Sequence, residues 1–290
     1  MKVSGGLGNQ LNFYFYKKFI ENNFCKDVYF DFELVDKDWQ CTNYFKYFGL
    51  KTEALPRNID LSKFRKLEEF ENKEEILKEN KTDLAVYSFY MHPYYYIHRT
   101  YDYLKDIKLD FGCIDDKDKE ILNKIGNTES VCIHLRRGDY YKIKATRNIF
   151  GVLDTAYYEK AINYIKERTS NPFFFVFSDE PSESSKIIDV KENICIVNHN
   201  ISRHYSALDN YSAFRKMKYL LKRINTGKLE KAYKDFFLMT KCKHHIISNS
   251  TFSWWSAFLA GNEQKIVIAP YKWSTKRTSE ETVPSDWIKL

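Results

Sequence analysis

Short, mainly apolar runs separated by helix-like segments constrain the fold of this chain more than any other feature. Residues 131–135 and 173–177 are two such runs, and charged residues follow each of them within two positions. A strand without polar alternation is buried on both faces, which is typical of a parallel sheet covered by helices on both sides. Further runs occupy residues 194–197, 245–247 and 265–269. The sequence therefore predicts an α/β protein.

In the first part of the chain, strand-like and helix-like segments alternate less clearly. We predict a strand at residues 28–32 and a charged helix at residues 60–82. The 290 residues are enough for two domains of ordinary size. We therefore predict two Rossmann-like domains, residues 1–125 and residues 126–290. Because ligands of open α/β sheets bind beyond the carboxyl ends of the strands, functional side chains are expected at those ends.

Bulk properties narrow the class of protein. No apolar run approaches the roughly 18–20 residues that span a bilayer, and the N-terminus lacks an apolar signal region. The six cysteines are scattered without a C-x-x-C pair, which predicts buried, reduced thiols and a cytoplasmic protein. A net charge of +7 is too small to indicate nucleic acid. It suits an anionic ligand, or peripheral contact with the inner face of an anionic cell membrane.

The first motif is Arg136-Arg137-Gly138-Asp139, which follows the run at residues 131–135. Two adjacent guanidiniums at a strand end form a cationic fork suited to phosphate. Arg136 would neutralise a diphosphate leaving group without a metal ion. Asp139 would be a general base or would orient an arginine, and Arg137 would anchor the loop through Asp139. A surface ion pair is the rival interpretation, and His134 is either structural or part of the site.

A second motif, Ser248-Asn249-Ser250-Thr251-Phe252-Ser253-Trp254-Trp255, surrounds a predicted helix start. One or two polar side chains suffice to cap a helix, so the surplus predicts a bound polyanion. At least one tryptophan is expected in the core. A third motif, Ser178-Asp179-Glu180, ends another apolar run and would suit a nucleobase or a ribose; a simple strand-end cap explains it equally well.

The remaining glycine motif, Gly5-Gly6-Leu7-Gly8-Asn9-Gln10, follows a short strand and opens a helix. Glycines let a ligand approach the backbone, and a helix start offers N–H groups to an anion. The third glycine of the dinucleotide fingerprint is missing. A tight turn without a ligand is an equal alternative.

The sequence contains several groups of possible metal ligands, and we interpret the acidic ones as solvent-exposed charged residues. Asp36-Lys37-Asp38 and Asp116-Lys117-Asp118 match the D-x-D pattern of one class of metal-dependent sugar transferases, but both lie in lysine-bearing polar stretches. The Cys242-Lys243-His244-His245 cluster falls on a strand, where neighbouring side chains point to opposite faces. No metal site is predicted.

Taken together and in their order along the chain, the motifs resemble glycosyltransferase family 11, the α-1,2-fucosyltransferases of bacterial surface polysaccharides and animal blood-group glycans. The resemblance implies a GT-B fold, in which two Rossmann-like domains face a central cleft. The domain at residues 126–290 would bind GDP-β-L-fucose, and the domain at residues 1–125 would bind the acceptor. L-Fucose would pass with inversion to the 2-hydroxyl of a terminal galactose-type residue, with no metal and no cofactor.

The resemblance also implies roles for individual residues. Arg136 would hold the β-phosphate, Asn9 would reach the same phosphate across the cleft, and Asp179 with the His134 region would bind guanine. The residues implied in catalysis are Arg136, Asp139 and Asn9. Those implied in donor binding are Gly6, Gly8, His134, Arg136, Asp179, Asn249, Ser250, Thr251, Phe252 and Ser253.

Two alternatives remain at this level. The motifs are expected to bind the GDP part of the donor more than its sugar. The first alternative is therefore a GT-B transferase that uses another GDP-deoxysugar. The second is a non-enzymatic glycan- or RNA-binding protein, which the positive charge and the aromatic residues 91–96 would suit. The expected partners are a GDP-sugar and an oligosaccharide or lipid-linked glycan acceptor, without nucleic acid.

Overall fold

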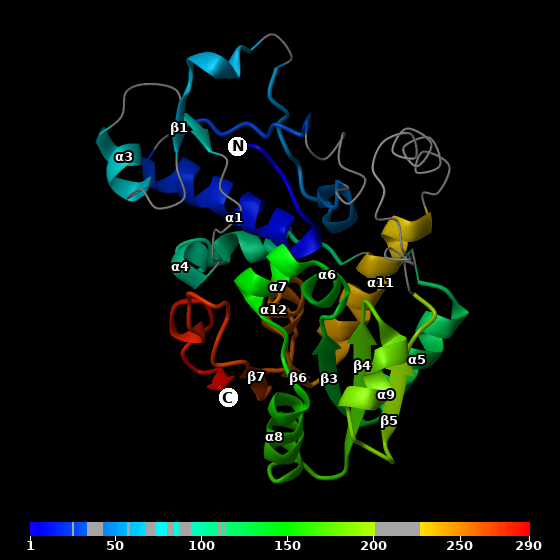
Figure 1. The fold of residues 1–290 in the computed structure, drawn as a ribbon. Helices are drawn as coiled ribbons and strands as arrows, with labels where there is room; N and C mark the ends of the chain where they lie inside the picture. Colours follow the sequence, from blue (N-terminus) through cyan, green and yellow to red (C-terminus); the bar gives the residue numbers. More distant parts are fainter. Residues whose placement is uncertain are drawn as a thin grey trace, which may run out of the picture. The chain divides into compact units, whose positions relative to one another are not determined.

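The computed structural model describes residues 1–24, 26–33, 43–56, 59–67, 73–79, 84–86, 94–109, 112, 114–200 and 227–290. These residues form two compact units, Met1–Asp110 and Phe111–Leu290, and each is described by itself. Figure 1 shows the elements of both units.

The second unit is built on a six-stranded parallel sheet with the strand order β5-β4-β3-β6-β7-β8. The strands are β3 (Glu129–Leu135), β4 (Pro172–Ser178), β5 (Ile194–Val197), β6 (His244–Ile246), β7 (Val267–Ala269) and β8 (Ile288–Lys289). The predicted runs all form strands of this sheet, whereas β8 was not predicted. Chain order reverses between β3 and β6, which makes this pair the switch point where open α/β sheets bind ligands.

Helices cover both faces of this sheet (Figure 1). They are α5 (Asp116–Gly126), α6 (Gly138–Lys142), α7 (Lys144–Phe150), α8 (Thr155–Lys166), α9 (Ser184–Ile187), α11 (Gly227–Lys241) and α12 (Thr251–Phe258), with 3-10 turns at Pro181–Glu183 and Ser279–Glu281. Helix α5 packs against β3 and α11. The unit boundary therefore lies at residue 110, not at the expected residue 125.

Alternation along β3 divides the core between the two faces. Val131, Ile133 and Leu135 pack on the α8 side, in one cluster with Tyr158 and Ile165. His134 points to the other face, where its ring lies 5.5 Å from that of Phe252 at the start of α12. At least one tryptophan was expected in the core, and both Trp254 and Trp255 of α12 are fully buried. This burial fixes α12 behind the carboxyl end of β6.

Asp154, and not Thr155, caps helix α8. The Asp154 carboxylate accepts the backbone N–H of Tyr157 at 3.0 Å, and Thr155 is the first helical residue. Either side chain could cap, but only the residue before the helix has the extended backbone that a cap requires.

The first unit contains α1 (Leu7–Phe24), α3 (Lys73–Glu79), α4 (Tyr94–Ile97), β1 (Arg65–Leu67), β2 (Leu84–Val86) and 3-10 turns at Phe45–Phe48, Leu61–Lys63 and Tyr101–Asp106. The predicted helix at residues 60–82 is wrong, because its described part contains a 3-10 turn, strand β1 and the short α3. The predicted strand at residues 28–32 is reduced to parallel bridges, Lys2 with Asp31 and Phe30 with Ala54.

Two further sequence predictions concern the burial of the cysteines and the presence of membrane-spanning helices. Cys132 and Cys242 are buried free thiols, as expected, whereas the free thiol Cys195 is only partly buried. Cys25, Cys41 and Cys113 lie outside the described residues. Within the part of the chain that the structure describes, no helix is both long and apolar enough to cross a bilayer.

Candidate functional site

The carboxyl ends of β3, β4 and β6 bring three predicted motifs together at one edge of the sheet. Leu135 at the end of β3 lies beside Ser178 at the end of β4, and Ile133 of β3 lies beside Ile246 of β6. The arginine fork, the Asp179 motif and the Ser248 motif therefore follow adjacent strands. Parallel pairing alone produces this arrangement.

Arg136 lies between two carboxylates at this edge. Its Nη2 is 2.7 Å from Asp139 Oδ1, and its Nη1 is 3.0 Å from Asp179 Oδ2. Helix α6 begins at Gly138, which places Asp139 one turn after Arg136. The Arg136 side chain is 31% exposed, so the held guanidinium still reaches solvent.

Arg137 is used differently from the way the sequence suggested. Its backbone N–H donates to Asp179 Oδ1 at 2.8 Å, which ties the end of β3 to the end of β4. The expectation that Arg137 pairs with Asp139 is wrong, because Arg136 makes that ion pair. Among the described residues, the buried Arg137 Nε has no hydrogen-bond partner.

His134 links β3 to the loop after β6. Its Nδ1 is 2.7 Å from Ser248 Oγ, and the residue is 5% exposed. Burial lowers the pKa of the His134 imidazole to about 3, so the ring is neutral near pH 7. The histidine therefore serves as a structural tie in this arrangement, and its predicted role toward guanine stays a prediction.

The start of α12 uses several of its polar groups internally. Asn249 Nδ2 donates to the carbonyls of Phe150 and Trp273, at 2.7 and 3.1 Å. Ser253 Oγ donates to the carbonyls of Ser248 and Ser250, both at 3.2 Å, and Ser253 is fully buried. Ser250 holds the N-cap position without a side-chain cap bond. Of the predicted donor set in this segment, Ser250, Thr251 and Phe252 are the partly exposed members.

Tyr140 is a residue that the sequence did not single out. Its hydroxyl donates to the Asn249 carbonyl at 3.2 Å, its ring stacks on Phe150 at 4.8 Å, and the Arg136 guanidinium lies 5.5 Å from the ring centre. Tyr140 thereby connects the arginine fork to the α12 start. Its place directly after Asp139 was the only signal in the sequence.

The glycine-rich turn belongs to the first unit. Gly5 has φ +75°, and a Cβ there would lie 2.4 Å from Asn9 Nδ2, so this position requires glycine. Gln10 donates from Nε2 to the Gly5 carbonyl at 3.1 Å and accepts the Tyr44 N–H at 2.8 Å. Gly6 and Gly8 flank the start of α1, and a Cβ on Gly6 would meet nothing within 4 Å. Asn9 and Arg136 belong to different units, so their shared phosphate contact stays a prediction.

Comparison with known families decides the class. The family model described as Glycosyl transferase family 11 matches residues 45–290. This chain belongs to glycosyltransferase family 11. The α/β architecture and the six-stranded parallel sheet are consistent with a GT-B-like fold.

Curated relatives of this family 11 chain carry related names. An "O-antigen biosynthesis glycosyltransferase WbnK" of Escherichia coli is 34% identical over 172 residues, 59% of this chain and 47% of the relative. An "Alpha-1,2-colitosyltransferase" of Escherichia coli is 33% identical over 174 residues, 59% of this chain and 51% of the relative. A "Galactoside alpha-(1,2)-fucosyltransferase 1" of Rattus norvegicus is 29% identical over 133 residues, 46% of this chain and 28% of the relative. The matched segment thus spans about half the length of the two bacterial relatives.

One acidic group in this family 11 chain departs from the sequence prediction. Asp116 is exposed, as expected, but Asp118 is fully buried and accepts hydrogen bonds from His199 and Asn200, each at 2.8 Å. Asp115, Asp118 and His199 are the single group of possible metal ligands among the described residues. The Lys234 ammonium lies 2.9 Å from Asp115 and 3.3 Å from Asp118, so a cation already balances these acids. Asp36 and Asp38 lie outside the described residues.

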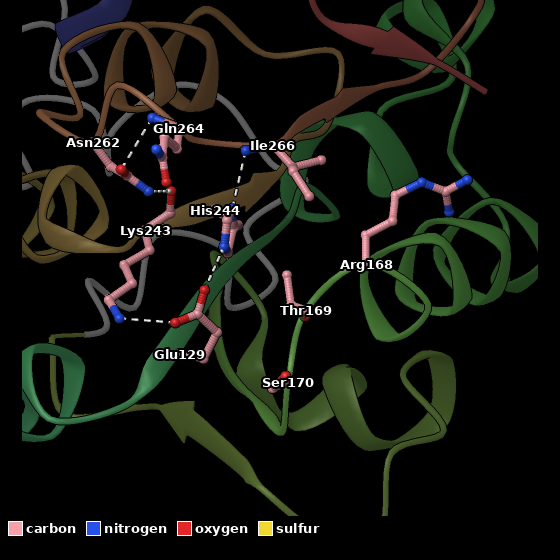
Figure 2. Close-up of a pocket in the computed structure, with 9 residues that line it drawn as sticks. All are labelled: Glu129, Arg168, Thr169, Ser170, Lys243, His244, Asn262, Gln264 and Ile266. Carbon is pink, nitrogen blue, oxygen red and sulfur yellow. Dashed lines mark hydrogen bonds and ion pairs between the residues drawn. The ribbon is translucent and has the colours of Figure 1, made fainter.

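A polar cavity of about 650 Å³ lies at the opposite, amino-terminal edge of the same sheet (Figure 2). Its Glu129 is 2.8 Å from both Lys243 Nζ and His244 Nε2, and His244 Nδ1 accepts the Ile266 N–H at 2.9 Å. The ion pair with Lys243 balances the charge of Glu129. None of the predicted donor residues lines this cavity.

Proposed function

We propose that this chain is an inverting α-1,2-fucosyltransferase, which transfers L-fucose from GDP-β-L-fucose to the 2-hydroxyl of a terminal galactose-type residue. The observation that carries this proposal is Arg136 held by Asp139 and Asp179 at the β3–β6 switch point of a family 11 chain. A guanidinium fixed at the carboxyl edge of a parallel sheet is suited to a diphosphate.

The proposed reaction is a direct displacement at the anomeric carbon of the donor. The acceptor 2-hydroxyl attacks the anomeric carbon of fucose, the bond from that carbon to the β-phosphate oxygen breaks, and GDP leaves. Negative charge grows on the β-phosphate, where the fixed Arg136 charge would stabilise it most in the transition state. The acceptor proton passes to a base, and Asp139 is the candidate if the incoming diphosphate takes its place on Arg136.

The supply of positive charge by arginine supports a reaction without a metal ion or another cofactor. Arg136 would bring to the diphosphate a positive charge that a metal ion would otherwise supply. In this proposal Asp115, Asp118 and Lys234 stabilise the fold and take no part in catalysis.

The partners proposed for this site are a GDP-sugar and an oligosaccharide or lipid-linked glycan. The relative named for O-antigen biosynthesis supports a place in bacterial surface polysaccharide synthesis. We further propose a cytoplasmic location with peripheral contact with the cell membrane. The rival of a non-enzymatic glycan- or RNA-binding protein loses support, because Tyr96 of the aromatic residues 91–96 is buried and donates its hydroxyl to the Asn12 carbonyl.

The decisive experiment offers the protein a panel of sugar nucleotides and follows hydrolysis and transfer, first with simple galactosides and then on a glycan array. We expect GDP-fucose to be used and the product to carry an α-1,2 linkage. Transfer from a UDP-sugar, or binding of glycans without turnover of any GDP-sugar, would contradict the proposal.

A second candidate donor is another GDP-linked deoxysugar. The relative named as a colitosyltransferase is 33% identical, close to the value for the O-antigen relative, so identity does not separate the two sugars. The same panel decides between them if a GDP-linked dideoxysugar is included, because the preferred donor will show the higher kcat/KM.

A further inference from the structure

The carboxyl ends of β3, β6 and β7 are joined by two tyrosine hydroxyls from α8. Tyr158 Oη donates to the His134 carbonyl at 3.2 Å. Tyr157 Oη contacts the Ile247 carbonyl at 2.6 Å and the Ile268 carbonyl at 3.2 Å. These two residues, the tyrosine pair, therefore reach the three strands that flank the switch point.

The contacts to His134 and Ile247 lie where the β3–β6 ladder stops, whereas the Ile268 carbonyl also accepts the Ile247 N–H within the sheet. The pairing of β3 with β6 ends at Ile133 and Ile246, one residue before His134 and Ile247. Beyond this point the strands diverge into the arginine fork and the α12 start. A buried carbonyl that leaves a ladder needs another donor, and the tyrosine pair supplies it.

The tyrosine pair is placed and protonated for this purpose. Tyr158 is 1% exposed and Tyr157 is 7% exposed, and both rings pack in the core cluster under the sheet. Burial raises the pKa of both hydroxyls above the usual value, so both stay neutral donors. The Asp154 carboxylate caps α8 through the Tyr157 N–H, which fixes the first turn of the helix under the strand ends.

The opposite face of the sheet carries the matching bond. His134 Nδ1 and Ser248 Oγ lie 2.7 Å apart on the α12 side, while Tyr158 approaches the His134 carbonyl from the α8 side. His134 precedes Arg136 by two residues, and Ser248 precedes the α12 start. The two strand ends are therefore held from both faces immediately before the proposed donor-binding groups.

We propose that Tyr157 and Tyr158 are positioning residues, which hold the ends of β3 and β6 so that Arg136 and the start of α12 can both contact the same GDP diphosphate. This role rests on the proposed function of the site, and the hydroxyls touch no substrate. Packing alone would be served equally well by phenylalanine, so the hydroxyl groups themselves distinguish the proposal.

The test compares Tyr158→Phe and Tyr157→Phe with Tyr164→Phe. Tyr164 lies on the same helix and packs on the same cluster, but its hydroxyl has no hydrogen-bond partner in the described part of the chain. Three quantities are measured on each variant of the whole chain: the Kd for GDP, the hydrogen exchange of peptides covering 136–142 and 248–252, and the thermal unfolding temperature. Donor KM and kcat follow where activity is present.

We expect Tyr158→Phe to weaken GDP binding roughly fivefold to tenfold, which corresponds to one hydrogen bond. Exchange in both peptides should become faster, donor KM should rise more than kcat falls, and Tyr164→Phe should change none of these. A lower unfolding temperature with unchanged GDP binding and unchanged exchange would overturn the proposal.

Two further outcomes test the positioning role separately from the identity of the donor. If the wild-type protein does not bind GDP, the proposed function fails, but faster exchange in Tyr158→Phe and not in Tyr164→Phe still supports the positioning role. If Tyr158→Phe and Ser248→Ala show additive effects on exchange, the coupling of the two faces is contradicted. Non-additive effects support it.

Discussion

The Arg136 guanidinium lies 2.7 Å from the Asp139 carboxylate, so the residue proposed for the leaving group already holds the residue proposed as base. The attraction between the two charges limits the positions that the guanidinium can take. In this state Asp139 holds Arg136 at the carboxyl end of β3.

The first prediction concerns Asp139→Asn. The amide keeps the shape but loses the charge, so Arg136 is held less firmly and GDP should bind about tenfold more weakly. Isothermal titration with GDP measures this directly. A large fall in kcat with unchanged GDP binding would instead identify Asp139 as the base. Glu180→Gln is a suitable control, because that carboxylate pairs with Lys142 beside the site and not with Arg136.

The second prediction concerns the two arginines separately. Arg136→Ala should lower kcat by at least about 10²- to 10³-fold, since it removes the charge that stabilises the leaving diphosphate. Arg137→Ala keeps the backbone N–H bond to Asp179 and should affect transfer less. Turnover assays and circular dichroism on both variants check this. Near-normal turnover in folded Arg136→Ala would contradict the phosphate role.

The sheet of the second unit could be predicted, because its strands are apolar on both faces and the parallel order follows from alternation with helices. Helices α6 and α7 could not be predicted, because residues 138–150 mix charged and apolar residues without a clear helical period. The first unit was harder still. Its predicted strand at 28–32 makes only bridges, so a short, mainly apolar run there did not produce a ladder.

The sequence predicted which residues lie at the site better than it predicted the direction in which their side chains point. Placing Arg136 and Asp179 at adjacent strand ends needs only the strand boundaries. Deciding that Asn249 and Ser253 turn inward needs the carbonyls of Phe150, Trp273 and Ser248, which come from three separate segments. The burial of Asp118 was missed for the same reason, since its partners His199 and Lys234 come from segments far along the chain.

The third prediction is that EDTA leaves transfer unchanged, within about twofold, because the fork supplies the positive charge for the leaving group. The assay is repeated after dialysis against EDTA and with added Mg²⁺ or Mn²⁺. Loss of activity that a metal restores would contradict the prediction and would direct attention to Asp115 and Asp118. Lys234→Ala is informative in that case, because removing the ammonium should then tighten metal binding.

The last prediction concerns acid sensitivity, and two buried histidines and one partly buried aspartate of the second unit determine its sign. Desolvation lowers the pKa of His134 and of His245 to about 3, and raises that of Asp235 to about 7. Between about pH 5.5 and pH 4.5 the two histidines take up protons only when the protein unfolds, whereas Asp235 holds its proton only when it is folded. In total, the unfolded state therefore binds one proton more than the folded state.

The free energy of unfolding should therefore fall by about 1 kcal/mol for each unit that the pH is lowered between about 5.5 and about 4.5, and less steeply above pH 5.5. His245→Leu removes one histidine and should make the curve nearly flat, because the remaining histidine and Asp235 then cancel. Asp235→Asn removes the opposing carboxyl and should about double the slope. Urea unfolding at several pH values measures all three proteins. Equal slopes in wild type, His245→Leu and Asp235→Asn would contradict the assignment, since the two substitutions change the number of protons bound on unfolding in opposite directions.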